Sequence, residues 1–244
     1  MLKFFRRIRQ SLFVDGGAKR YFFYAIGEII LVVVGILIAL QINNWNEYRK
    51  DRILEKEYLS RLNEDLTFDI SWIDYYFLDR FEKKIQSLEK AKTYYQGTYV
   101  IKDTVQFLDD ISYGGVFGNV DWTLNKNTYN EIISTGNLRK IDNDTLRTKI
   151  NNYYESVDAY IIASKNYVSG YINYINSMKS FNPNNPSNIS EFDKKFLMNH
   201  LKTEEFYRLT NLEITLAYRI QDWAKIVKDN AIDLVENIDK ALEK

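Results

Sequence analysis

Hydrophobic and polar positions divide the chain into one continuous apolar stretch and a long series of amphipathic segments. Residues 21–42 read YFFYAIGEIILVVVGILIALQI, and Glu28 is the one charged side chain among them. As an α-helix this stretch would be about 33 Å long, enough to cross a hydrocarbon core of about 30 Å. The pattern therefore predicts a transmembrane helix over residues 21–42.

The flanks of this stretch indicate a permanent anchor. A secretory signal peptide has an apolar core of about 7–15 residues that ends at small residues, whereas this stretch is longer and leads into Gln41-Ile42-Asn43-Asn44-Trp45. More cations precede the stretch (Lys3, Arg6, Arg7, Arg9, Lys19 and Arg20) than follow it closely (Arg49, Lys50, Arg52 and Lys56). The positive-inside rule then places the N-terminus in the cytoplasm. We expect a single-pass protein of a bacterial inner membrane, with a periplasmic C-terminal domain.

Residues 1–20 are predicted to form a cytoplasmic basic segment that contacts membrane lipid. Leu2, Phe5 and Leu12 recur at helical spacing among basic residues, which is typical of a helix lying in the membrane interface. The alternative is a disordered basic tail that only sets the topology. The side chains expected to anchor the chain at the two interfaces are Arg6, Arg7, Arg20, Trp45 and Tyr48.

After the anchor, residues 43–244 show helical periodicity in three long stretches. From residue 47 to 96 apolar side chains recur every three or four positions without proline or glycine, and Gly97 is a plausible stop. A second helix is expected from residues 142–144 to 178, with a seam of Leu146, Ile150, Tyr153, Val157, Tyr160, Ser164, Tyr167, Tyr171, Tyr174 and Met178. A third covers residues 203–242, with a core face of Leu209, Leu212, Leu216, Ile220, Trp223, Val227, Ala231, Leu234, Ile238 and Leu242.

Shorter helices are expected between the long ones. Residues 104–111 follow Asp103 as a cap, residues 127–134 end at Gly136, and residues 191–201 follow a loop at 182–190 that holds both prolines. Amphipathic helices are stable only when their apolar faces pack together. The sequence thus predicts an all-α protein: an N-terminal transmembrane helix, then an antiparallel, up-down-up bundle of three long helices with short accessory helices.

Charge and composition restrict the classes of partner. The formal net charge is zero, but residues 1–20 carry six cations and one acid, so they contribute +5 and the remaining residues −5. The acidic body argues against nucleic-acid binding. The sequence contains no cysteine, which excludes disulfides and thiolate metal sites.

Glu28 is the anomalous residue of the apolar stretch. A carboxylate at the centre of a bilayer costs about 2.5–3.5 kcal/mol on insertion scales, so it needs a partner, a proton or a shallow position. At 100° per residue Glu28, Gly35, Ala39 and Asn46 project from nearly one side, and Gly35 with Ala39 forms a small-xxx-small pair. We expect this stripe to pack against another transmembrane helix. The alternative is a Glu28 that reaches the headgroups, with ordinary small residues below it.

No motif for catalysis, a cofactor or a metal ion stands out. The acidic clusters Glu64-Asp65-Asp69 and Asp109-Asp110 lack ligand spacing with His200, the only histidine. There is no phosphate-binding glycine loop and no nucleophile elbow. The tyrosine seam could line a polar groove, although aromatic stripes at helical spacing are more often core. We therefore expect a protein that is not an enzyme and binds no cofactor.

Residues 25–47, AIGEIILVVVGILIALQINNWNE, with KFFRRIRQ before them, resemble an uncharacterised family of small single-span membrane proteins of Bacteroidota, a domain of unknown function. The segments YLSRLNEDL at 58–66 and STGNL at 134–138 are also similar to the family pattern. The resemblance implies an inner-membrane protein with one span and a helical domain, and brings no known activity or ligand.

Two functional classes are expected. The first is a non-enzymatic scaffold that forms a homo-oligomer or docks on a larger membrane protein complex of the envelope. The second is a periplasmic ligand-sensing helical bundle, by architectural analogy. The first is favoured because only about 20 residues precede the span, too few for a cytoplasmic output domain.

Overall fold

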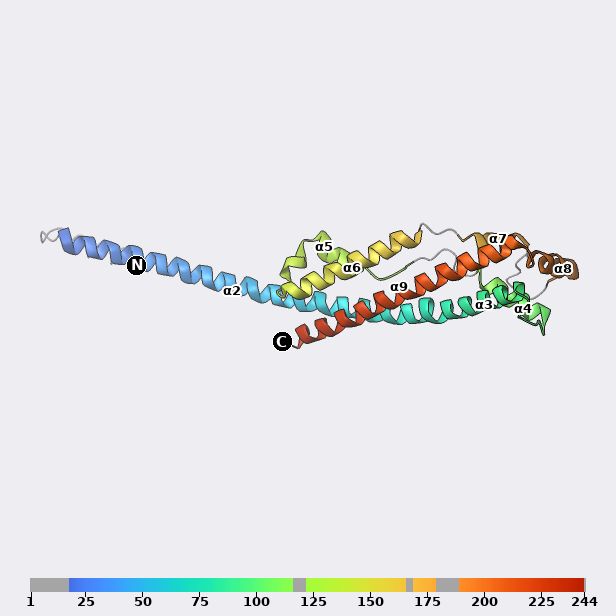
Figure 1. The fold of residues 1–244 in the computed structure, drawn as a ribbon. Helices are drawn as coiled ribbons and strands as arrows, with labels where there is room; N and C mark the ends of the chain where they lie inside the picture. The colour runs from blue at the N-terminus through green and yellow to red at the C-terminus, as the bar shows by residue number, and fades with distance from the viewer. Residues whose placement is uncertain (1–17, 116–121, 166–168, 179–188, 244) are drawn as a thin grey trace. The chain divides into compact units, whose positions relative to one another are not determined.

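A computed structural model describes residues 18–115, 122–165, 169–178 and 189–243 (Figure 1). Every element in these ranges is helical, and they contain no strand. The amphipathic segment expected before the span, with Arg6 and Arg7, lies outside the described residues, as do most of the proline loop and Tyr167. The prediction of an all-α chain is confirmed for the part that the structure describes.

The chain divides into two compact units, Met1–Glu55 and Lys56–Lys244. The first unit holds the N-terminal part of α2 (Ala18–Ile73), and α2 begins the only described helix that is long and apolar enough to cross a membrane. The large apolar side chains of this part, from Phe22 to Ile42, are almost all exposed. An exposed row of such side chains is unfavourable in water and favourable in hydrocarbon.

In the second unit the first helical stretch runs through the rest of α2, the π-helical turn η1 (Asp74–Asp79) and α3 (Arg80–Tyr95). The predicted end is confirmed, because Gly97 adopts φ 77°, a left-handed conformation that terminates helices. The π-helical turn was not predicted. It inserts an extra residue where Phe77 is buried on one side while Tyr75 stays exposed on the other.

The short helices lie where the sequence places them. They are α4 (Thr104–Tyr113), α5 (Asn127–Ser134) and α8 (Glu191–His200). The 3-10 turn η2 (Asn137–Lys140) after α5 was not predicted. The Asp103 carboxylate caps α4 by accepting from the backbone N–H groups of Val105 and Gln106. Thr203 caps α9 (Glu204–Leu242) in the same way. The single helix expected from residue 144 to 178 is wrong, because α6 (Asp144–Lys165) and α7 (Gly170–Met178) are separate helices.

Within the second unit α9 packs against both other long stretches. It runs antiparallel to the stretch from α2 to α3, as the contacts of Asn63 with Asp239, Asp74 with Lys228, and Lys84 with Glu213 show. It also runs antiparallel to α6, through the pairs Lys149–Asp233 and Tyr160–Trp223. These pairs make α6 parallel to the first stretch, so the alternating up-down-up order is wrong. The reason is that the residues after α4 return along α2 before α6 begins, as the contacts of Asn125 with Asp69 and of Glu131 with Arg61 show.

The core combines the predicted apolar faces with several polar groups. Leu62, Leu66, Phe77 and Leu88 are fully buried in the first stretch. On α9 the predicted face is confirmed at six positions, which are buried: Leu216, Ile220, Val227, Ala231, Leu234 and Ile238. Leu209, Trp223 and Leu242 are half-buried, and the prediction is wrong at Leu212, which is 51% exposed. The neighbouring Glu213 is buried instead because it pairs with Lys84.

Candidate interaction site

The predicted membrane stripe lies in the first unit. Within it Ala39 is exposed and Glu28 and Asn46 are partly exposed. A Cβ placed on Gly35 would meet nothing within 4 Å, so the backbone of α2 is open to a neighbour at this position. The geometry leaves room for a close helix–helix contact at Gly35 and Ala39.

The predicted interfacial anchors Trp45 and Tyr48 are both exposed. The guanidinium of Arg52 lies 5.1 Å from the centroid of the Tyr48 ring, and Lys50 forms an ion pair of 3.0 Å with Glu47. Aromatic and basic side chains of this kind suit the boundary between water and lipid. The side chain of Arg20 lies outside the described part of the molecule.

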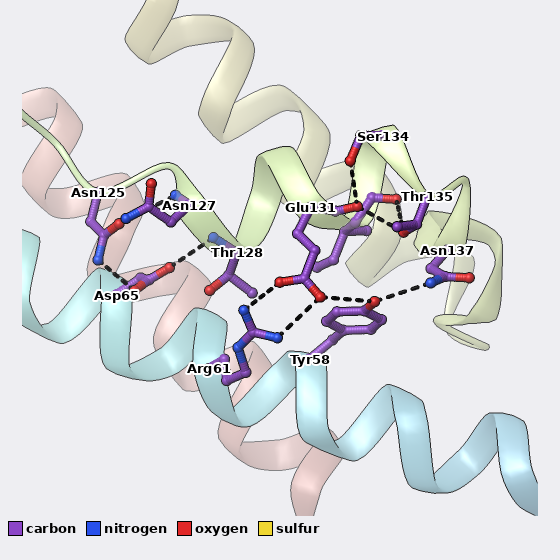
Figure 2. A network of polar contacts seen from close by, with 11 residues as sticks. Tyr58, Arg61, Asp65, Asn125, Asn127, Thr128, Glu131, Ser134, Thr135 and Asn137 are labelled. Atoms are coloured by element: carbon purple, nitrogen blue, oxygen red, sulfur yellow. Dashed lines mark hydrogen bonds and ion pairs between the residues drawn. The ribbon is translucent and has the colours of Figure 1, made fainter.

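In the second unit a network of polar contacts joins the segment around α5 to α2 (Figure 2). At one end Asp65 accepts from Asn125 Nδ2 (2.5 Å) and from the backbone N–H of Thr128 (3.3 Å). Asp69, one turn further along α2, accepts from the backbone N–H of Asn125 at 2.9 and 3.1 Å. Carboxyl oxygens from α2 thus accept from the residues at the N-terminal end of α5, where the first backbone N–H groups have no partner within the helix.

At the other end of α5 an ion pair and a tyrosine complete the network. Arg61 contacts Glu131 through two hydrogen bonds of 3.3 and 2.5 Å, and Tyr58 Oη donates to Glu131 at 3.3 Å (Figure 2). Asn137 Nδ2 donates to Tyr58 Oη at 3.0 Å. The hydrogen bond from Arg61 lowers the pKa of Glu131 below its ordinary value.

Asp69 is the unusual member of this network because its carboxylate is fully buried. Its pKa is raised to about 7, chiefly by burial and also by the nearby Asp65, while the hydrogen bond from Asn125 acts in the opposite direction. A carboxylate in such a place is stabilised when it is neutral. The sequence shows Asp65 and Asp69 as a surface cluster, and nothing in the spacing indicates that one of them is buried.

A second buried polar group joins α3, α7 and α9. Lys84 and Glu213 are 1% and 3% exposed and form an ion pair. Ser169 Oγ donates to the second carboxylate oxygen of Glu213 at 2.5 Å and accepts from the backbone N–H of Ile172 at 3.1 Å. Burial lowers the pKa of Lys84, and Glu213 opposes this shift.

The π-helical turn and the residues next to it carry an aromatic patch beside the buried Phe77, whose ring centroid lies 5.1 Å from that of Tyr76. We define this aromatic patch as Phe68, Trp72, Tyr75, Tyr76 and Arg80. The Trp72 ring stacks on Tyr76 with 5.2 Å between centroids, and the Arg80 guanidinium lies 4.9 Å from the Tyr75 centroid. Phe68 and Tyr75 are 60% and 53% exposed. Tyr, Trp and Arg are the residue types enriched at protein–protein interfaces.

The turn after α3 contributes to an open cavity of about 500 Å³, lined by Tyr94, Tyr95, Gly97, Tyr99 and Lys202. Tyr95 stacks on Tyr207 with 4.5 Å between centroids. The cavity offers aromatic faces, hydroxyls and one ammonium group, but no nucleophile paired with a base.

No metal-ligating cluster is found among the residues that the structure describes. These residues hold no group of three or more His, Asp or Glu side chains placed to bind an ion. The Nδ1 atom of His200 lies 2.8 Å from the carbonyl oxygen of Phe196, one turn earlier in α8. The described polar clusters instead join helices to one another.

Comparison with known proteins identifies the family of the chain. No curated protein and no solved structure matches the chain. A family model described as a family of unknown function, DUF6090, matches residues 28–185. The match begins at Glu28 in the apolar helix and includes both ends of the network around α5, so the chain belongs to this family of unknown function, DUF6090.

Proposed function

We propose that the protein is a membrane-anchored, non-enzymatic interaction module that forms a homo-oligomer or docks on a membrane protein complex of the bacterial envelope. The observation that carries the proposal is the row of exposed large apolar side chains from Phe22 to Ile42 in a helix long enough to cross a bilayer. Such a row is stable when lipid or another transmembrane helix covers it. We place the anchor in the inner membrane, with the N-terminus in the cytoplasm and residues 43–244 in the periplasm as a bundle.

The span itself supplies the first contact surface. Gly35 and Ala39 permit close approach of a second helix, and Glu28 on the same side would hydrogen-bond across that contact. The occupant we propose is the same helix of a second copy, because every copy in one membrane presents this stripe in the same orientation. The aromatic patch supports the same general role, since its residue types dominate the energetics of protein interfaces.

A crosslinking experiment in native membranes tests this proposal. The full-length chain contains no cysteine, so a single cysteine introduced at Ala39 reports dimer contact through disulfide formation. We expect Gly35→Ile to reduce the crosslinked fraction severalfold. The matched control is Gly27→Ile, because Gly27 is equally open but projects about 100° away from the stripe. Equal crosslinking in wild type, Gly35→Ile and Gly27→Ile would refute the span contact.

Anchoring and topology are tested separately. We expect the intact chain to stay in vesicles washed with alkaline carbonate. We also expect a cysteine placed at the exposed Ile162 to react with an impermeant thiol reagent from the periplasmic side only. Release into the wash, or labelling only from the cytoplasmic side, would contradict the proposed location.

Ligand sensing is the second candidate, and one observation favours it. The open cavity of about 500 Å³ has the volume of a small-molecule site and combines three tyrosines with Lys202. Screening anionic and aromatic small molecules by thermal shift would test it. A ligand that stabilises wild type but not Lys202→Ala or Tyr99→Ala would favour sensing over docking.

A further inference from the structure

The segment from Trp122 to Asn137 is attached to the rest of the second unit by contacts of two kinds. Its polar contacts with Tyr58, Arg61 and Asp65 of α2 are drawn in Figure 2. It makes a further polar contact with Asp69, also on α2. Its apolar contacts include Trp122 stacked on Phe77 at 4.4 Å and Tyr129 stacked on Tyr154 at 4.1 Å between centroids. Asp69 is the one carboxylate of the network that is fully buried.

The surroundings of Asp69 provide few hydrogen-bond donors for a charged carboxylate. Both of its oxygens share one donor, the backbone N–H of Asn125. Three buried polar atoms of the surrounding elements have no hydrogen-bond partner among the described residues: Tyr153 Oη, Tyr154 Oη and Trp122 Nε1. None of them therefore donates to Asp69. A buried carboxylate normally needs two or three donors to stay ionised. The site therefore favours the neutral acid.

The titratable groups around Asp69 add no compensating positive charge. On its own helix the nearest is the acidic Asp65. From α6 the phenols Tyr153 and Tyr154 face it, and both have pKa values raised chiefly by burial and further by the carboxylates. The Trp122–Asn137 segment carries one cation, Lys126, and its Nζ atom forms an ion pair of 2.5 Å with Asp158.

We propose that Asp69 is a proton-operated latch: its neutral carboxyl keeps the Trp122–Asn137 segment docked on α2, and loss of the proton to solvent weakens that docking. In the docked state the neutral acid still accepts from the Asn125 N–H. Ionisation places a second negative charge beside Asp65 in a site that water does not reach. Opening the segment hydrates the carboxylate, so the charged form favours the open state.

The pH window follows from the two states of Asp69. Its pKa is about 7 when the segment is docked, and the ordinary value of 3.8 applies when the group is in water. The docked state therefore binds the proton more tightly, and its advantage is lost progressively as pH rises from about 4 to about 7. Above about pH 7.5 both states are ionised, and the opening equilibrium no longer depends on this group. From pH 5.5 to pH 7.5 the opening constant should rise about twentyfold.

Thiol labelling of the full-length chain in detergent tests the latch, because the protein contains no cysteine of its own. Ile132 is 0% exposed on α5, whereas its neighbour Ile133 is 44% exposed. The labelling rate of Ile132→Cys, divided at each pH by that of Ile133→Cys, reports how often the segment opens. We expect this ratio to rise at least tenfold from pH 5.5 to pH 7.5 and to level off above it.

Two further variants decide whether Asp69 is responsible. In an Asp69→Asn background, which keeps the shape and removes the charge, we expect the ratio to stay constant between pH 5.5 and pH 7.5. In an Asp65→Asn background we expect the rise to occur at lower pH, because the neighbouring charge is gone. A ratio that is independent of pH in wild type overturns the latch, and so does a rise that persists unchanged with Asn at position 69. Crosslinking of the span does not enter this measurement, so its outcome is independent of the proposed oligomer.

Discussion

Replacement of Lys84 by methionine would test how the second unit tolerates a buried charge. Met has nearly the volume of the Lys stem, so the variant removes the ammonium and leaves the packing around α3 and α9 largely intact. Glu213 would then remain buried, with the Ser169 hydroxyl still donating to its carboxylate. Removing one partner of a buried pair costs about 3–5 kcal/mol, because the other charge is left uncompensated.

The reverse variant should be milder. In Glu213→Leu the Lys84 ammonium loses its ion pair with Glu213, and burial already lowers the pKa of this amine. An amine with a lowered pKa can lose its proton and remain buried as a neutral group. We therefore expect Glu213→Leu to destabilise the unit by about 2–3 kcal/mol, less than Lys84→Met does.

The double variant gives the decisive comparison. Lys84→Met/Glu213→Leu replaces both charges with apolar groups of similar size, and such replacements are often neutral or stabilising. We expect its free energy of unfolding to lie within about 1 kcal/mol of wild type, which gives a coupling energy of about 4 kcal/mol or more between the two sites.

Urea unfolding of the full-length chain in detergent, followed by tryptophan fluorescence, measures these values. A matched control is the exposed pair Lys149–Asp233, where Lys149→Met should change stability by less than about 1 kcal/mol. Two results would contradict this reasoning. The first is a loss of stability in Lys84→Met no larger than in Lys149→Met. The second is a loss in the double variant equal to the sum of the losses in the two single variants, because the two sites would then have no coupling energy.

Other variants test separate parts of the fold. Phe77→Ala should cost about 3–5 kcal/mol in urea unfolding because the ring is fully buried, while Phe68→Ala, 60% exposed, should cost less than about 0.5 kcal/mol. Gly136→Ala should destabilise the unit by about 1 kcal/mol, measured the same way, because Gly136 has φ 68°. The lowered pKa of Glu131 means that the folded state favours its carboxylate, so wild type should lose stability as pH falls below about 4. Glu131→Gln should not show this loss, and hydrogen exchange of α5 at pH 3 and pH 5 would measure the difference.

Helix positions and caps were predictable because they depend on local sequence. Asp103 before a helical pattern and Gly97 after one are signals that involve only neighbouring residues, and the structure confirms both. The apolar faces were predictable for the same reason, since periodicity of 3.6 residues shows which side of a helix is buried. Membership of the uncharacterised family was also predictable from the residues around the span.

The direction of α6 and the buried charges were not predictable from these signals. The alternating order assumed that each connection leads directly to an antiparallel neighbour, but Asn125 and Glu131 bind α2 and carry the chain back along it. Glu213 looked like a surface residue beside Leu212, and only the distant Lys84 makes its burial favourable. The information in each case lies in pairs more than 50 residues apart, which periodicity does not report.

The polar pairs between the long helices also determine the register in which these helices pack. An apolar seam such as that of α9 can slide along its neighbour by one turn, about 5.4 Å, and still bury apolar groups. Asn63–Asp239 and Asp74–Lys228 fit one register, because the two pairs are 11 residues apart on both helices, and Lys84–Glu213 joins the same two stretches further along. We therefore expect Lys84→Met/Glu213→Leu to populate more than one register between α9 and its neighbour, although its free energy of unfolding stays close to that of wild type. Disulfide formation between introduced cysteines measures the register. In the wild-type background Asn63→Cys should crosslink with Asp239→Cys and hardly with Glu243→Cys, one turn further along α9. In the Lys84→Met/Glu213→Leu background both crosslinks should form. If the double variant forms only the native crosslink, the apolar faces alone determine the register.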